Sequence, residues 1–537
     1  MSERLYLYDT TLRDGQQTQG VQFSAAEKVE IAQMLDALGL DYIEGGWPGA
    51  NPTDSEFFQH APKTRAMLTA FGMTKRAGRS AANDDVLAMV LNAGTAGVCL
   101  VGKTHDFHVS AALGISLEDN LENISASLSH IVAQGREALF DAEHFFDGWK
   151  ANPAYALECL IAARDAGARW IVLCDTNGGT LPHEIGEIVG QVIAAGIPGD
   201  RLGIHTHDDT GNAAAGSLAA IRAGARQVQG TLNGLGERCG NANLTTLIAT
   251  LALKPEFASL VPQISPDALK MLVQTSRRLD EILNRAPLPN APFVGASAFA
   301  HKAGLHASAI IKNPSTYEHV PPETVGNRRI IPMSNQAGQS NLRARLKDAG
   351  LDIPESADLA AILSDVKARE DQGYAYDVAQ ASFELLARRH LGQLPRFFDV
   401  ERYRVIVEGR RDGAGKPISV SEAVVTVRLH GQRVMSVSES HGESDSDDRG
   451  PVNALWRALG KDLGAYQASI DDMWLVDFRV RITQGGVDAV TRVTIDSEDG
   501  QGNRWSTVGV SPNIVDASFE ALHDAVVWKL IRDGASP

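Results

Sequence analysis

The stretch GARWIVLCDTNGGTLPHEIGEIVGQVIAAGIPGDRLGIHTH, residues 167–207, contains one complete strand–helix–strand unit. Its two apolar runs, Trp170–Thr176 and Leu202–His207, have the length and composition of buried strands. Between them, Pro182–Ala195 places apolar residues at helical spacing. Strands that alternate with helices in this way predict right-handed crossover connections and a parallel sheet.

The same unit repeats through the first 260 residues, which we predict to be one catalytic domain. Eight strand–helix units in about 250 residues favour a (β/α)8 TIM barrel, and an open doubly wound sheet is the alternative on pattern alone. Ser24 and Glu27 have the spacing of a capping box at the start of the first helix. The eight apolar runs are Leu5–Thr11, Tyr42–Trp47, Met67–Met73, Gly97–Lys103, Ala138–Phe146, Trp170–Thr176, Leu202–His207 and Gln227–Asn233.

The pattern changes twice beyond the barrel. Residues 261–399 are predicted to form helical linker subdomains that contribute to the active site. Residues 400–537 show strands followed by a helix, twice, which predicts an α+β regulatory domain with an internal repeat. The Ser- and acid-rich stretch Ser436–Asp448 is interpreted as a solvated loop. The expected helices are Arg277–Asn284, Ala357–Glu370, Asp377–His390, Pro451–Leu463 and Asn513–Ile531, and the expected strands are Tyr403–Glu408, Glu422–Leu429, Asp477–Ile482 and Thr491–Asp496.

The composition excludes several classes of partner. The 537 residues include 50 Lys or Arg and 66 Asp or Glu, a formal net charge of −16, which argues against nucleic acid and against an anionic membrane surface as partners. The sequence shows neither an apolar stretch of about 18 residues nor an N-terminal basic segment followed by an apolar run. The four cysteines have no metal-site or redox spacing, which favours a cytoplasmic protein.

Polar residues follow the ends of the predicted strands, where a TIM barrel carries its active site. His205 and His207 are two residues apart on a strand, so their imidazoles point to the same side. Together with Asp14 and Asn241 they offer a mixed nitrogen and oxygen site for Mg²⁺, Mn²⁺ or Zn²⁺. Without Asp14 and Asn241, the two histidines would be more simply explained as polar residues near a strand end.

Arg13 lies beside Asp14, and its planar guanidinium suits a carboxylate or a developing alkoxide. Glu44 is a candidate partner that orients Arg13, and a purely structural ion pair between neighbouring strands is the alternative. Glu143 stands among aromatic residues and is a candidate for acid–base chemistry. The alternative for Glu143 is an ordinary polar residue at the barrel mouth.

His306 and Tyr317 follow the barrel in the sequence. As a pair they can relay a proton if the linker region closes over the barrel. Each of them alone is better explained as a structural residue.

Several runs resemble those of a known family. The run YDTTLRDGQQ resembles the opening of the metal-dependent Claisen-condensing barrels, which include the 2-isopropylmalate, homocitrate and citramalate synthases and the lyase of hydroxymethylglutaryl-CoA. The resemblance extends over essentially the whole chain and, within the superfamily, is greatest to the long form of the citramalate synthases. The runs that carry it are Tyr8–Gln17, Tyr42–Gly49, Asp141–Gly148, His205–His207, Gly234–Asn241, His301–His306 and Gly509–Ser518.

The resemblance implies that acetyl-CoA, pyruvate and water give (R)-citramalate and CoA in isoleucine biosynthesis. It implies a divalent cation on Asp14, His205 and His207, completed by Asn241, that holds the carboxylate and keto oxygen of pyruvate. Thr176 then donates a hydrogen bond to that carboxylate.

The resemblance also implies that Arg13 stabilises the oxygen that becomes negative when the acetyl carbon attacks. Glu143, with His306 and Tyr317, takes the methyl proton from acetyl-CoA and later assists thioester hydrolysis. Which of these three groups is the base stays open.

The family's C-terminal repeat senses amino acids, which implies isoleucine as an effector, and its members are homodimers in which the linker covers the partner's barrel. Here an acidic, Ser-rich segment replaces the usual Gly-Asp-Gly approach to Gly450–Leu455, a departure that bears on effector sensitivity. The open alternatives are a 2-isopropylmalate or homocitrate synthase, which use other 2-oxo acids, and a retro-Claisen lyase or aldolase. A non-catalytic binding protein on the same fold is a further class.

Overall fold

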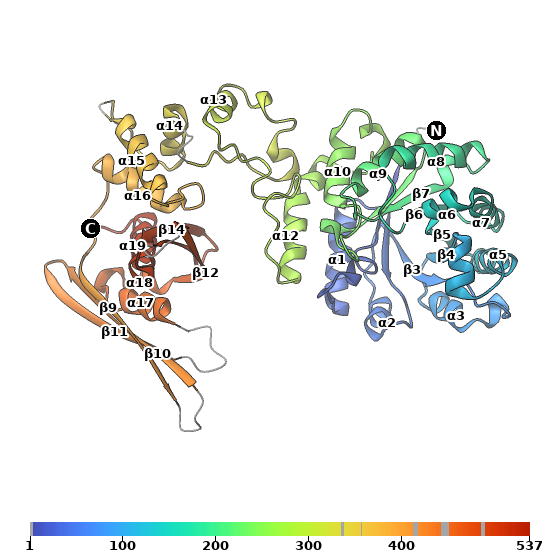
Figure 1. The fold of residues 1–537 in the computed structure, drawn as a ribbon, viewed down its shortest axis with the longest axis horizontal. Helices are drawn as coiled ribbons and strands as arrows, with labels where there is room; N and C mark the ends of the chain where they lie inside the picture. Colours follow the sequence, from blue (N-terminus) through green and yellow to red (C-terminus); the bar gives the residue numbers. More distant parts are fainter. Residues whose placement is uncertain (1–3, 334–337, 356, 412–416, 442–449, 485–488) are drawn as a thin grey trace. The chain divides into compact units, whose positions relative to one another are not determined.

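The computed structural model describes residues 4–333, 338–355, 357–411, 417–441, 450–484 and 489–537 (Figure 1). The chain forms two compact units. The first contains Met1–Phe299 and Val320–Arg328, and the second contains Ala300–His319 and Arg329–Pro537.

The first unit is a closed barrel of eight parallel strands in chain order, in which β1 pairs with both β2 and β8. This confirms the predicted (β/α)8 fold. The strands are β1 Tyr6–Asp9, β2 Tyr42–Gly46, β3 Met67–Met73, β4 Gly97–Lys103, β5 Glu137–Glu143, β6 Trp170–Asp175, β7 Leu202–Thr206 and β8 Gln227–Gly230.

Helices follow the strands, and their ends match local sequence signals. The predicted capping box is present, because the Glu27 amide donates to Ser24 Oγ at 3.3 Å and the Ser24 amide donates to Glu27 Oε2 at 2.7 Å. The α-helices of this unit are α1 Ala25–Ala37, α2 Pro52–Gln59, α3 Asp85–Asn92, α4 Asp106–His108, α5 Leu117–Ala133, α6 Phe145–Ala151, α7 Pro153–Asp165, α8 Pro182–Ala194, α9 Ala213–Ala223, α10 Leu244–Leu253, α11 Pro266–Lys270 and α12 Leu272–Ile282.

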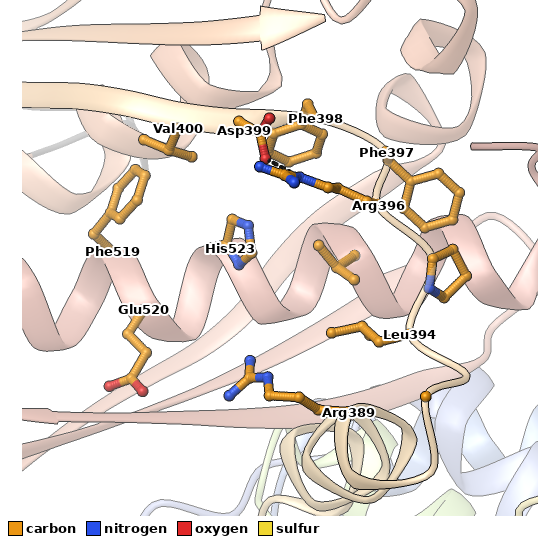
Figure 2. Close-up of a pocket in the computed structure, with 13 residues that line it drawn as sticks. Arg389, Leu394, Arg396, Phe397, Phe398, Asp399, Val400, Phe519, Glu520 and His523 are labelled. Atoms are coloured by element: carbon orange, nitrogen blue, oxygen red, sulfur yellow. Dashed lines mark hydrogen bonds and ion pairs between the residues drawn. The ribbon is translucent and has the colours of Figure 1, made fainter. Parts of the chain in front are cut away.

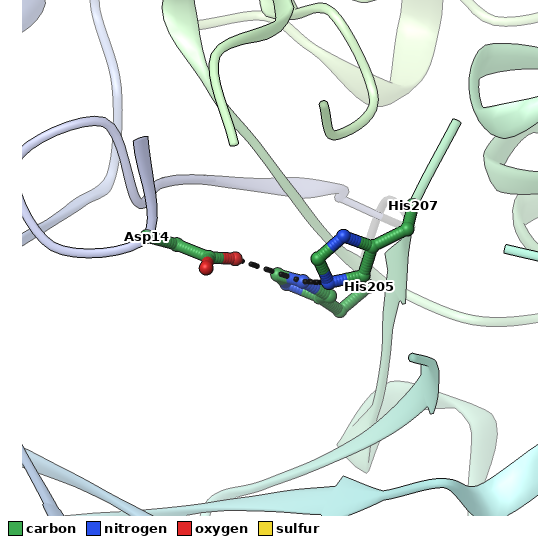
Figure 3. Close-up of side chains that lie close together, drawn as sticks. All are labelled: Asp14, His205 and His207. Carbon is green, nitrogen blue, oxygen red and sulfur yellow. Dashed lines mark hydrogen bonds and ion pairs between the residues drawn. The ribbon is translucent and has the colours of Figure 1, made fainter. Parts of the chain in front are cut away.

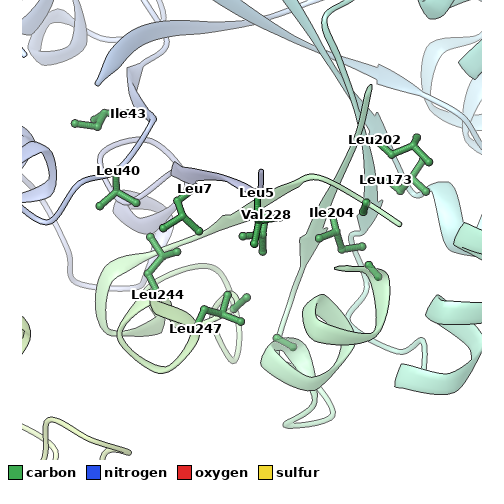
Figure 4. Packing of buried hydrophobic residues seen from close by; sticks show 14 of the residues in the cluster. Leu5, Leu7, Leu40, Ile43, Leu173, Leu202, Ile204, Val228, Leu244 and Leu247 are labelled. Carbon is green, nitrogen blue, oxygen red and sulfur yellow. The ribbon is translucent and has the colours of Figure 1, made fainter. Parts of the chain in front are cut away.

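Side chains on alternate strand positions form two separate layers. Those that point outward pack against the helices, and Figure 4 shows Leu7 of β1 and Val228 of β8 directed toward Leu244 and Leu247 of α10. Those that point inward form an aromatic-rich cluster inside the barrel. Its members are Tyr8, Tyr42, Phe71, Cys99, Leu139, Trp170, Val172 and Cys174. Burial on both sides accounts for the continuous apolar runs of the sequence.

The second unit begins with helices and ends with two similar halves. Each half is a three-stranded antiparallel sheet followed by a helix, with strand orders β11-β10-β9 and β12-β13-β14, so the predicted α+β domain with an internal repeat is confirmed. The elements are α13 Gly304–Lys312, α14 Gln339–Asp348, α15 Leu359–Asp371, α16 Gln380–His390, β9 Asp399–Arg411, β10 Pro417–Leu429, β11 Gln432–His441, α17 Pro451–Gly460, α18 Gln467–Asp471, β12 Met473–Gln484, β13 Val490–Asp499, β14 Arg504–Ser511 and α19 Ile514–Arg532.

The predicted loop over Ser436–Asp448 is wrong for its first part. Residues 436–441 belong to β11 and pair with β10, and residues 442–448 lie outside the described residues. The hydroxyl of Ser436 is buried and donates to the Lys461 carbonyl at 3.0 Å, so a serine-rich stretch is accommodated once its neighbours supply the hydrogen bonds.

Among the described residues, we find no helix that has both the length and the hydropathy needed to span a membrane.

Candidate active site

A cavity of about 240 Å³ lies at the carboxyl ends of the barrel strands. This is the edge at which TIM barrels place their chemistry. Its lining includes predicted site residues from four strands and the loops that follow them: Arg13, Asp14, Glu143, Thr176, His205 and His207. The structure therefore brings these side chains together from distant parts of the sequence.

Asp14, His205 and His207 form a compact cluster of buried ligand-type groups (Figure 3). The Nε2 atoms of the two histidines are 3.3 Å apart, and His205 Nε2 is 3.2 Å from Asp14 Oδ2. Asn241 donates from Nδ2 to Asp14 Oδ2 at 2.6 Å, while its Oδ1 is buried without a hydrogen-bond partner. A buried amide oxygen without a donor is costly, so this donor set fits a divalent cation.

Two members of the cluster, Asp14 and His207, have pKa shifts that favour cation binding. Burial opposes the charge of Asp14, but Arg13 and His205 hold the pKa of this carboxyl well below its usual range. Burial, together with the neighbouring His205, lowers the pKa of His207 to about 3. Asp14 is therefore ionised and His207 neutral near pH 7, and these are the protonation states that bind metals.

Gln229 of β8 contacts this cluster, and the sequence did not mark it as a candidate site residue. Its Oε1 lies 2.8 Å from His205 Nδ1, and its Nε2 donates to Asp141 Oδ1 at 3.1 Å. With Asp141 accepting, the amide oxygen faces His205 and accepts the Nδ1 proton. The Nε2 lone pair of His205 is then left for a cation.

Replacing Gln229 by leucine is expected to weaken Mn²⁺ binding about 10–100-fold, because the His205 ring loses the partner that fixes its tautomer and orientation. Titration calorimetry measures this. Gln227→Leu is the matched control, since it makes the same change two residues earlier in β8, nearer the amino end of the strand. Equal Mn²⁺ affinity in the Gln229→Leu and wild-type proteins would show that Gln229 has no role in the site.

Arg13 is held on three sides. Its Nε donates to Glu44 Oε2 at 2.6 Å, its Nη1 is 3.4 Å from Asp14 Oδ1, and its guanidinium carbon lies 3.9 Å from the centroid of the Phe71 ring. Glu44 is fully buried and also accepts from the Tyr8 hydroxyl at 2.9 Å. Burial raises the pKa of Glu44, and the adjacent guanidinium opposes that rise. Glu44 thus contacts Arg13, and Arg13 lines the cavity.

Glu143 closes β5 and forms an ion pair with Lys103 at the end of β4. The two residues are direct partners in the strand register. The neighbouring Phe145 and Phe146 are buried in the core between barrel and helices, so the carboxylate has Lys103 beside it instead of the aromatic surroundings expected from the sequence.

Thr176 follows β6 and lines the cavity. Its Oγ1 accepts a hydrogen bond from the His144 amide at 2.8 Å, and His144 has a left-handed backbone with φ 57°. Within the described residues the Thr176 hydroxyl proton has no acceptor. It is therefore available to a ligand in the cavity.

His306 and Tyr317 lie in the second unit, where their ring centroids are 4.2 Å apart. Tyr317 is 44% exposed. The structure thus brings these two residues together, and their approach to a barrel stays a prediction.

A larger cavity of about 630 Å³ lies in the second unit, and none of the predicted site residues lines it. In Figure 2, Phe519 and His523 on α19 face the segment that carries Phe398 and Asp399. Its polar groups include the Arg396–Asp399 ion pair, with Arg396 Nε 2.5 Å from Asp399 Oδ1. Among the described residues, no cluster of three or more ligand-type side chains close enough to share a metal ion is found at this cavity. We therefore place the candidate active site in the barrel.

Comparisons with known proteins agree with this architecture. Residues 4–276 match the family described as HMGL-like, residues 293–374 match the homocitrate synthase post-HMGL domain-like family, and residues 377–530 match the LeuA allosteric (dimerisation) domain.

Full-length relatives narrow the family further. The chain is 47% identical to an (R)-citramalate synthase of Aquifex aeolicus over 99% of both chains, and 44% identical to one of Streptomyces coelicolor over 100% of this chain and 98% of the relative. A 2-isopropylmalate synthase of Pectobacterium atrosepticum is 29% identical, over 97% of this chain and 92% of the relative. With its HMGL-like barrel and LeuA domain, the chain belongs to the (R)-citramalate synthase family.

Proposed function

We propose that this protein condenses acetyl-CoA with pyruvate and hydrolyses the thioester, giving (R)-citramalate and CoA, as a transferase of isoleucine biosynthesis. The observation that carries the proposal is the 40–47% identity to relatives of that name over nearly the whole chain. It is supported by a small cavity in which Arg13, Thr176, Glu143 and the cluster around Asp14 meet.

Asp14, His205, His207 and Asn241 are the residues that would hold a divalent cation, Mn²⁺, Mg²⁺ or Zn²⁺. Such a cation supplies Lewis-acid polarisation of the keto group of pyruvate. The Asn241 Oδ1 atom, buried without a donor, is the fourth protein ligand in this proposal.

The remaining residues act on the organic substrates. Thr176 donates its free hydroxyl proton to the pyruvate carboxylate. Arg13, oriented by Glu44, donates to the keto oxygen as it becomes negative. Glu143 takes the methyl proton of acetyl-CoA.

The second unit completes this scheme. His306 and Tyr317 share in the proton transfers and in thioester hydrolysis, so residues 261–399 contribute to the catalytic barrel of residues 1–260.

We place the protein in the cytoplasm, which is supported by four cysteines that are all free thiols.

The test is release of free CoA from acetyl-CoA with a panel of 2-oxo acids, with and without Mn²⁺ or Mg²⁺. Pyruvate is expected to exceed 2-oxoisovalerate and 2-oxoglutarate by a large ratio of kcat/KM. Comparable rates with 2-oxoisovalerate would indicate a 2-isopropylmalate synthase, and comparable rates with 2-oxoglutarate would indicate a homocitrate synthase. CoA-independent cleavage of a hydroxy acid would indicate an aldolase.

The protein is also proposed to be a homodimer. The second unit matches a dimerisation domain, and one strand of it exposes an apolar row that is unusual on a monomer surface. That row comprises Phe478, Val480 and Ile482 of β12, which pair with alternate residues of β13 and therefore share a face.

Replacing Val480 by aspartate is expected to halve the mass measured by light scattering, because a charge in the middle of this row opposes burial against a partner. Val132→Asp is the matched control, as Val132 is similarly exposed, at 40% against 43%, but lies on α5 of the barrel. A dimer that survives Val480→Asp would exclude the β12 face as the main contact.

The regulatory domain, residues 400–537, is proposed to bind isoleucine as an effector. Calorimetry of the full-length protein with isoleucine, and with lysine as control, tests this. Absence of heat together with unchanged CoA release at saturating isoleucine would contradict the proposal.

A further inference from the structure

Trp47 follows β2 and has a firmly anchored backbone. Its amide donates to Asp54 Oδ2 at 2.8 Å, and Asp54 is ion-paired with the fully buried Lys28. The Lys28 ammonium also donates to the carbonyl oxygens of Leu12 at 2.8 Å and Gly45 at 3.2 Å. Lys28 thereby ties together the chain just before Arg13, the chain just after Glu44 and the anchor of Trp47.

Gly46 explains why the chain can come so close to this anchor. Its φ is +146°, and a Cβ atom placed there would lie 2.5 Å from Asp54 Cγ. Only glycine permits the approach. Pro48 further restricts the backbone of Trp47 from the other side.

The Trp47 side chain belongs to the wall of the active-site cavity. Its ring packs against Phe71 with the centroids 5.5 Å apart and the planes at 78°. The Phe71 ring in turn lies against the guanidinium of Arg13. The orientation of Arg13 and the position of the Trp47 ring are therefore linked through one shared aromatic neighbour.

The lining of the cavity is divided by polarity. Its large apolar side chains are Trp47, Phe71 and Val101, which come from the neighbouring strands β2, β3 and β4 and the loops after them, and the small side chain of Cys174 adds to them from β6. Thr176 and His207 follow β6 and β7, on another part of the barrel. A 2-oxo acid whose carboxylate and keto group face the polar part has its alkyl group directed to the apolar part.

We propose that Trp47 is a specificity-determining residue whose ring limits the alkyl group of the 2-oxo acid to a methyl. This inference rests on the proposed function and names the wall that selects its substrate. Trp47 has the largest side chain of the apolar part, and its anchored backbone prevents it from moving aside for a longer chain. One methylene in a hydrophobic pocket is worth about 10–200-fold in kcat/KM, which is the range of discrimination that such a wall can supply.

The test compares pyruvate with 2-oxobutyrate, which is one methylene longer, in the wild-type and Trp47→Leu proteins with Mn²⁺. Trp47→Leu is expected to raise kcat/KM for 2-oxobutyrate relative to pyruvate at least about tenfold. The readout is the ratio of kcat/KM for the two substrates, so a loss of kcat that affects both equally, for example through the Phe71 ring that contacts Trp47 and Arg13, does not change it. Trp47→Phe removes less volume and carries the same test, with a smaller shift, if Trp47→Leu does not fold.

Phe58→Leu is the matched control, because Phe58 lies on α2 beside Gly45 and outside the cavity lining. It is expected to leave the substrate ratio unchanged. An equal shift in Phe58→Leu would assign the selectivity to general loosening around β2 and overturn the inference. An unchanged ratio in a folded Trp47 variant would also overturn it, whereas a wild-type protein that releases no CoA with pyruvate contradicts the proposed function itself.

Discussion

Replacing His207 by alanine is expected to abolish cation binding at the barrel mouth and, with it, CoA release. His207 Nε2 lies 3.3 Å from His205 Nε2, so the substitution removes one of two nitrogen ligands directed at the same point. Lewis-acid stabilisation of several kcal/mol would be lost, which corresponds to a fall in kcat of about 10³-fold or more. Mn²⁺ calorimetry and the CoA assay measure the two effects separately, and His205→Ala is expected to behave in the same way.

His183→Ala is the matched control, since His183 is an exposed histidine on α8 of the same barrel. It should retain both Mn²⁺ binding and turnover. The wild-type protein should lose activity with a chelator and regain it when Mn²⁺ is added. Near-normal CoA release after chelation, or in His207→Ala, would show that the cluster is not a catalytic metal site.

The barrel was predictable because its strands are buried on both faces. Such strands appear in the sequence as continuous apolar runs, and the run Trp170–Thr176 differs from β6 by one residue. Strand ends were less predictable, since local hydrogen bonds decide them. The run Leu5–Thr11 contains β1, which stops at Asp9 because its carboxylate accepts from the Thr11 amide at 2.8 Å and turns the chain.

Strands of the second unit were harder to find. β14 has the sequence RWSTVGVS, in which small and polar residues interrupt the alternation. It is a strand because α19 packs closely on it, and a Cβ atom at Gly509 would lie 2.0 Å from the Ala517 carbonyl oxygen. That contact joins residues on different elements, so no local pattern could show it.

The residues of the site, too, could be predicted only in part from the sequence. Position at a strand end marked Arg13, His205 and Glu143 as candidates, because chain order determines which residues reach the barrel mouth. The lateral partners Lys103 and Gln229 depend on strand register and on which side chains point inward. The sequence gives no register for strands 40 residues apart, so these contacts required the structure.

Replacing Arg13 by lysine is expected to lower kcat about 10²–10³-fold with pyruvate, the usual effect of removing one preorganised donor to a developing oxyanion. Burial alone would lower the pKa of Arg13, but Glu44 and Asp14 raise it above its usual value, so the group is always charged. Lysine keeps the charge. It lacks the planar guanidinium, which binds Glu44 through Nε and at the same time presents its other N–H groups to the cavity.

Arg222→Lys is the matched control, because Arg222 forms an exposed two-point ion pair with Glu256, away from the cavity, and should leave kcat unchanged. Mn²⁺ affinity separates two roles of Arg13, which also lies 3.4 Å from Asp14. If Arg13→Lys binds Mn²⁺ normally and loses kcat, the guanidinium acts on the reacting oxygen. If the loss of activity follows a loss of Mn²⁺, Arg13 only holds Asp14 in place, and its role as an oxyanion donor is wrong.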